Sequence, residues 1–174
     1  MPLSSTLKRQ MINVLLLLGV VGLAWVVYLQ LQEDQAGAET LYQDGIGETM
    51  RTVSIRVPGQ PEILIESEAT DTKMLWKIVK PVQTGASTQS LQHLFTLLSE
   101  PILVEYPAAD KDLRAFGLAE SAIVLRFNAV EYRLGNLNPV NYRRYILLND
   151  RILMVNEAVY ELLTRGVDGF KEKN

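Results

Sequence analysis

Residues 122–155 read AIVLRFNAVEYRLGNLNPVNYRRYILLNDRILMV, with short apolar runs joined in pairs by turn-forming residues. Asn128-Ala129 separates the first pair of runs, and Asn149-Asp150 separates the second. Asn and Asp tolerate the positive φ angles of a two-residue hairpin turn. The stretch therefore predicts two tight antiparallel hairpins, with strands at Ala122–Phe127, Val130–Leu134, Tyr145–Leu148 and Ile152–Val155.

The region before these hairpins alternates in the same way and adds one amphipathic helix. In Thr88–Ser99 the apolar residues Leu91, Leu94, Phe95 and Leu98 recur at helical spacing, after Ser87 or Thr88 as the cap. A short helical turn ended by Gly117 and a last helix at Glu157–Arg165 complete the pattern. The remaining runs predict strands at Thr52–Val57, Glu62–Glu66, Leu75–Val79 and Ile102–Tyr106. Adjacent hairpins with two or three packed helices predict an α+β fold with a mainly antiparallel sheet.

The size of the chain suits one such domain. It has 174 residues, 48% of them hydrophobic and 21% charged, close to the average for a folded protein. We place the domain at residues 52–166 and a polar tail at 167–174, because a domain of this size needs only one core.

The N-terminal part predicts a membrane anchor at 11–31. From Val14 to Tyr28 the chain reads VLLLLGVVGLAWVVY without a charged side chain, and the flanking apolar residues bring it near the length that crosses a bilayer. Lys8 and Arg9 precede it and acidic residues follow it, which puts residues 1–10 in the cytoplasm. Residues 32–51, rich in Gly, Glu, Asp and Gln, are expected to form a stalk.

A cleaved signal peptide is the alternative, because Ala36-Gly37-Ala38 has the small residues of a cleavage site. The apolar run is longer than the core of a typical signal peptide, and the candidate site lies well beyond its end. Both observations favour the anchor over cleavage after Ala38.

Charge and residue usage exclude several functions. All 20 acidic residues follow the apolar run, whereas two of the 17 basic residues precede it, so the rest of the chain carries a net charge of −5. Such a domain should avoid nucleic acid. One histidine and no cysteine argue against the usual zinc sites, and we expect no metal and no cofactor.

Three stretches resemble the bacterial family called domain of unknown function 4340. They are Leu75–Pro81 followed by the helix SLQHLFTLLSE, then Asp112–Leu118, and then Leu134-Gly135-Asn136 before a closing hairpin. The resemblance covers about Thr52 to Leu163, with Phe116 where the family commonly has tyrosine and Ser121 near a usual proline. It implies a membrane-anchored exported protein, similar in some members to auxiliary components of ABC-type transport or gliding-motility systems.

No catalytic residue is assigned. His93 lies off the apolar helix face, which favours a solvent-exposed side chain over a catalytic base. The acidic residues near the first hairpin, Glu62, Glu66, Glu68 and Asp71, favour a solvated face. Asp110 and Asp112 favour a helix start over an acid and base pair. We therefore predict that the protein is not an enzyme.

The densest basic and aromatic cluster is the candidate binding site. Such residues can grip a carboxylate, a phosphate or a partner surface, although adjacent Arg143 and Arg144 should point to opposite faces of a strand. The candidate residues are Arg133, Tyr142, Arg143, Arg144 and Tyr145.

These observations predict an accessory or scaffold protein of the bacterial inner membrane, held by residues 11–31 in the lipid bilayer and bound to a membrane-protein partner. Its C-terminal domain would be periplasmic or extracytoplasmic. The alternative is a membrane-tethered domain that binds a ligand or a cell-envelope glycan.

Overall fold

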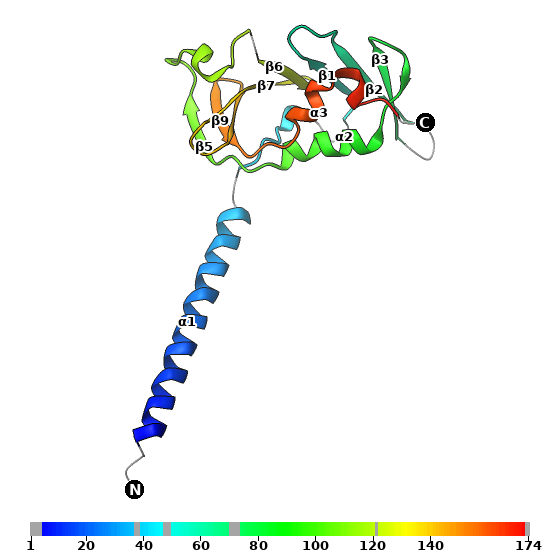
Figure 1. Ribbon diagram of the computed structural model, residues 1–174. Helices are drawn as coiled ribbons and strands as arrows, with labels where there is room; N and C mark the ends of the chain where they lie inside the picture. The colour runs from blue at the N-terminus through cyan, green and yellow to red at the C-terminus, as the bar shows by residue number, and fades with distance from the viewer. Residues whose placement is uncertain (1–4, 37–38, 47–49, 70–73, 121, 173–174) are drawn as a thin grey trace. The chain divides into compact units, whose positions relative to one another are not determined.

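The computed structural model describes residues 5–36, 39–46, 50–69, 74–120 and 122–172 (Figure 1). The chain forms two units, Met1–Ala38 and Glu39–Asn174.

The first unit is one helix, α1 (Ser5–Ala36), 32 residues long. Its side chains are described from Asn13 to Leu29, and the large apolar ones are between 45% and 73% exposed. The rings of Trp25 and Tyr28 lie together, with centroids 6.1 Å apart. Among the residues that the structure describes, no helix is long and apolar enough to cross a membrane.

The second unit is built on one nine-stranded sheet in which all paired neighbours are antiparallel. Its order is β4-β3-β2-β1-β6-β7-β8-β9-β5, so most neighbours in space are also neighbours in sequence. The predicted α+β class with a mainly antiparallel sheet is confirmed. The strands are β1 (Thr52–Arg56), β2 (Ile63–Ala69), β3 (Met74–Lys80), β4 (Thr84–Gly85), β5 (Val104–Pro107), β6 (Ile123–Phe127), β7 (Val130–Leu137), β8 (Arg144–Leu148) and β9 (Arg151–Val155).

The two predicted tight hairpins are present. Asn128 turns β6 into β7 at φ 50°, and Asn149 turns β8 into β9 at φ 53°. Asn128 also accepts hydrogen bonds at Oδ1 from the backbone N–H groups of Arg51 and Thr52, at 2.9 and 3.0 Å. The first hairpin turn thus holds the start of β1 in place.

Helices α2 (Thr88–Phe95) and α3 (Tyr160–Thr164) pack on one face of the sheet, here called the inner face (Figure 1). Ser87 caps α2, as predicted, and accepts a hydrogen bond from Ser90 N. The predicted helix at 88–99 is divided, since its last turn is a 3₁₀ helix, and the last helix starts later than expected. The helical elements are η1 (Asp44–Ile46), α2 (Thr88–Phe95), η2 (Thr96–Ser99), η3 (Leu113–Phe116), α3 (Tyr160–Thr164) and η4 (Gly166–Gly169).

The folded unit extends beyond the predicted 52–166 at both ends. Leu41 and Ile46 of the expected stalk are fully buried in the core, and Thr40 forms a β-bridge with Pro101. Phe170, in the expected polar tail, is also fully buried. Each of these is a single apolar residue in a polar segment. Its side chain is buried because packing against the inner face removes it from water.

A second, smaller apolar layer lies on the opposite, outer face at one end of the sheet. Every residue of β9 except Arg151 is buried, and Ile152 and Met154 belong to this outer layer rather than to the main core. The segment around η3 covers it, with the Phe116 ring edge-on to Tyr145 at 5.0 Å. Gly117 ends η3 at φ 68°, the left-handed conformation predicted for it.

Candidate functional site

The five predicted binding residues do not form one site. They lie in three different surroundings: an ion-pair cluster on β7 around Arg133, a buried ion pair at the start of β8 around Arg144, and the tip of the β7–β8 hairpin. Tyr142 and Arg143 belong to this tip, and Tyr145 supports it from β8.

Arg133 lies in the ion-pair cluster on the outer face. The Glu131 carboxylate accepts hydrogen bonds from Arg133 Nε at 2.8 Å and from Arg126 Nη2 at 2.5 Å. Arg126 is the cross-strand partner of Glu131 on β6. Burial alone would raise the pKa of the Glu131 carboxyl, but the hydrogen bonds from both guanidinium groups outweigh it and lower the pKa. Two cations therefore share one carboxylate, and the cluster carries a net positive charge.

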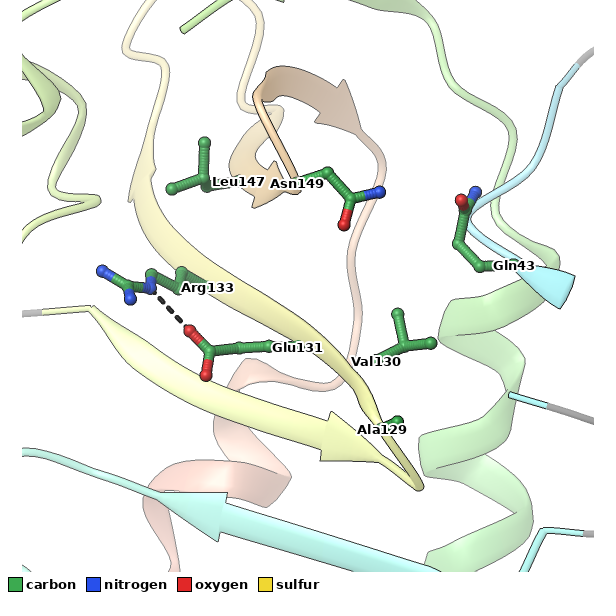
Figure 2. Close-up of a pocket in the computed structure, with 7 residues that line it drawn as sticks. All are labelled: Gln43, Ala129, Val130, Glu131, Arg133, Leu147 and Asn149. Atoms are coloured by element: carbon green, nitrogen blue, oxygen red, sulfur yellow. Dashed lines mark hydrogen bonds and ion pairs between the residues drawn. The ribbon is translucent and has the colours of Figure 1, made fainter. Parts of the chain in front are cut away.

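Two hollows of the surface meet at Arg133. The first, of about 570 Å³, lies beside the β7 and β8 strands (Figure 2) and is lined by Gln43, Ala129, Val130, Glu131, Arg133, Leu147 and Asn149. The second, of about 580 Å³, is more apolar and is lined by Arg56, Pro58, Leu113, Ala119, Glu120, Ala122, Val124 and Arg133. Within the described part of the chain, the terminal nitrogens of Arg133 have no hydrogen-bond partner, so they can receive a carboxylate or a phosphate.

Arg144 has a structural position. Its side chain is 7% exposed and pairs with Glu157, whose side chain is 1% exposed. It also donates from Nη1 to the Gly135 carbonyl oxygen at 2.6 Å, and its Cζ lies 3.8 Å from the centroid of the Tyr160 ring. Glu157 in turn accepts a hydrogen bond from Tyr160 N at the start of α3. This pair joins β8 to the last helix, and Arg144 is therefore not available to a ligand.

Tyr142 lies on the tip of the β7–β8 hairpin, at residues 138–143. Its side chain is exposed, as is that of Val140, which was not among the predicted binding residues. Asn138 Nδ2 donates to the Tyr145 hydroxyl at 2.8 Å, so Tyr145 supports the base of the tip. The available sequence signal for Val140 was its position directly after the turn-forming Asn138-Pro139.

Other predicted residues occupy ordinary surface positions. His93 is exposed on α2, and Glu62 pairs with Arg56 at 3.3 Å. Asp112 caps η3 and accepts hydrogen bonds from Arg114, which lower the pKa of its carboxyl. Asp71 lies outside the described residues. No group of three His, Cys, Asp or Glu side chains that could hold a metal ion is present in the part of the chain that the structure describes.

Comparisons of the chain with protein-family models, with characterised proteins and with solved structures find no match.

Proposed function

We propose that the protein is a non-enzymatic, single-pass accessory or scaffold protein of the bacterial inner membrane, with its N-terminus in the cytoplasm and residues 39–172 on the far side. The observation that supports the membrane anchor is the exposed apolar surface of helix α1. The large apolar residues among its described side chains are exposed all along Asn13 to Leu29. A helix that is apolar on every side needs a membrane or the interior of a large protein around it. The proposed anchor comprises the whole apolar run 11–31 of the sequence, which is longer at both ends than the segment whose side chains are described.

A scaffold role suits the way in which the charged residues of the second unit are used. Glu62, Glu131 and Glu157 each have an arginine partner, so these carboxylates hold elements of the fold together. The resemblance to the domain of unknown function 4340 family supports the same role, since members of that family look like auxiliary components of membrane assemblies such as ABC-type transport systems.

Alkaline extraction of membranes tests the anchor. We expect the full chain to stay in the membrane pellet, and the doubly substituted chain Leu17→Asp, Val21→Asp to be released, because each carboxylate costs about 3 kcal/mol at the centre of a membrane helix. The same pair of changes at exposed positions of the second unit, Leu75→Asp and Val82→Asp, is the control. An intact mass that lacks the first 38 residues would refute the anchor and support cleavage after Ala38.

Affinity purification in mild detergent tests the scaffold role. We expect one membrane protein to copurify at a constant ratio when the tagged chain is expressed at its natural level. Recovery of the chain alone, with a defined ligand bound to it, would refute a scaffold.

The second candidate function is binding of a ligand or a cell-envelope glycan, and the hollows beside Arg133 favour it. Titration of the full chain in micelles with soluble cell-envelope glycan fragments, followed by NMR, tests this function. Arg133→Gln should abolish the shifts, whereas Arg114→Gln, at a side chain far more exposed to solvent, should leave them unchanged. Equal shifts in both variants would exclude Arg133 as the binding residue.

A further inference from the structure

The tip of the β7–β8 hairpin, residues 138–143, exposes more apolar side chain than any other described part of the second unit. Val140 is 86% exposed and Tyr142 is 79% exposed, whereas the other exposed large apolar residues of that unit are at most 49% exposed. Isolated exposed apolar residues are common on protein surfaces. Two of them within three positions of one turn, both far more exposed than the rest, make this tip unusual.

The tip is held in one conformation by Asn138. Its backbone N–H donates to Arg143 O at 2.7 Å, and its carbonyl oxygen accepts from Tyr142 N at 2.9 Å. Its side-chain Oδ1 accepts from Val140 N at 2.9 Å, and its Nδ2 donates to Tyr145 at 2.8 Å. Because one residue fixes both ends of the turn, Val140 and Tyr142 are presented in a fixed arrangement, which lowers the entropy lost on binding.

Tyr142 has a backbone conformation that its side chain does not favour. Among the described residues, three non-glycine residues have positive φ, and the other two are the asparagines of the tight hairpins, which adopt it readily. Tyr142, at φ 54°, is bulky and gains little packing in return. Such strain persists where the surrounding structure enforces it, and it clusters at functional sites such as ligand clamps and switch regions. Tyrosine is also among the residues most often found to dominate the affinity of protein interfaces.

The charge and place of the tip indicate which kind of partner it fits. Residues 138–143 contain one cation, Arg143, and no acidic residue, although the domain as a whole is acidic. No ion pair of Arg143 is present among the described side chains. The chain enters the folded unit at Glu39, which pairs with Arg151 just beyond the far end of β8. The tip therefore lies at the opposite end of β8 from this entry point. A turn that presents two exposed apolar side chains and one cation, with no acidic residue, fits a protein surface that has an apolar pocket and acidic residues.

We propose that residues 138–143 form the contact of this domain with its protein partner, and that the partner offers an apolar pocket with acidic residues at its rim. Val140 and Tyr142 enter the pocket, and Arg143 meets the acidic rim. The inference rests on the proposed scaffold function, because it names the surface through which the scaffold binds.

Affinity purification of the full chain with four single substitutions tests the contact. Tyr142→Asn and Val140→Ser should each lower the recovered partner about tenfold or more, as expected for central interface residues. Arg143→Gln should lower it less, and Arg143→Glu more, because the reversed charge faces the acidic rim. The matched control is Leu75→Ser, an exposed apolar residue on β3, which should leave recovery unchanged.

The stability of the Tyr142→Asn variant separates binding from folding. Asparagine accepts positive φ, so the melting temperature should rise by about 2–4 °C while the partner is lost. A photoreactive p-benzoyl-phenylalanine in place of Tyr142 should form an adduct with that same partner, at a peptide that contains acidic residues.

The outcomes distinguish the inference from the function on which it rests. If the wild-type chain recovers no partner, the scaffold function fails and this inference fails with it. If the tip variants recover the partner as well as the wild type does, the inference alone is overturned. It is also overturned if the photoreactive group attaches only to lipid or to a second copy of this chain.

Discussion

Substitution of Arg144 by methionine should destabilise the domain strongly. The change removes the charge that faces Glu157, the hydrogen bond to the Gly135 carbonyl and the contact with the Tyr160 ring. The Glu157 side chain is 1% exposed, so its carboxylate would remain buried without a cation. Removing one partner of such a pair typically costs about 3–5 kcal/mol. Since a domain is stable by only about 5–15 kcal/mol, a large part of the stability would be lost.

Urea unfolding of the full chain in micelles, followed by tryptophan fluorescence and circular dichroism, measures this cost. Arg133→Met is the matched control, because its pair with Glu131 is partly exposed and should be worth about 1 kcal/mol or less. In the double variant Arg144→Met, Glu157→Leu no charge is left unpaired. Its loss should be smaller than the sum of the two single losses by about 1–3 kcal/mol.

Two results would refute this reasoning. One is a loss below about 1 kcal/mol for Arg144→Met, which is the cost expected for an exposed pair. The other is strict additivity of the two single changes, which would mean that Arg144 and Glu157 do not interact in solution. A ligand that binds the wild type and the Arg144→Met variant equally would agree with the structural role of Arg144.

Three further predictions concern other parts of the fold. Tyr132→Phe should cost about 1–2 kcal/mol in urea unfolding and speed proteolysis of residues 39–46, because the Tyr132 hydroxyl donates to the Leu41 carbonyl oxygen at 2.6 Å inside the core. The pKa of Glu100 is raised in the folded protein, mainly by burial and then by the nearby Glu157 carboxylate. The protonated Glu100 therefore contributes stability at a pH below the pKa of the unfolded chain, and this contribution is lost as the pH rises through the pKa of the folded protein. Glu100→Gln should accordingly raise the melting temperature at about pH 7 and have no such effect near pH 4, and an equal rise at both values would contradict the assignment. Gly135→Ala should cost about 2 kcal/mol or more, because the new Cβ would lie 2.3 Å from a backbone carbonyl oxygen, and an unchanged melting temperature would show that the two segments are not in contact.

The hairpins were predictable from the sequence because their signals are local. Alternation of apolar residues marks the strands, and Asn128 and Asn149 mark the turns that join them. The burial of Leu41 and Phe170 had no such signal, since each is a single apolar residue in a polar stretch. Only the inner face of the sheet, assembled from distant strands, decides that these residues are buried.

The candidate site was predicted only in part, for a similar reason. The density of Arg and Tyr selected Tyr142 and Arg143, which lie on the tip, but it also selected Arg144, whose burial depends on Glu157 from another element. Arg143 and Arg144 were expected to point to opposite faces of one strand, but β8 begins only at Arg144. Arg143 lies just before the strand and is half-buried, whereas Arg144 is buried. The positive φ of Tyr142 could not be predicted, because glycine and asparagine are the usual residues in that conformation.

The arrangement at Gly135 explains how the tip is connected to the rest of the domain. The segment of η3 can lie directly on β7 because Gly135 has no side chain there, and it brings the Phe116 ring onto Tyr145. The Tyr145 hydroxyl then accepts the hydrogen bond from Asn138 that fixes the base of the tip. The Gly135 carbonyl oxygen also accepts a hydrogen bond from the side chain of Arg144, which is the first residue of β8 after the tip. Both strands that carry the tip are therefore fixed through one glycine, so a partner that binds the tip would contact a surface whose geometry is set by the packing on the outer face.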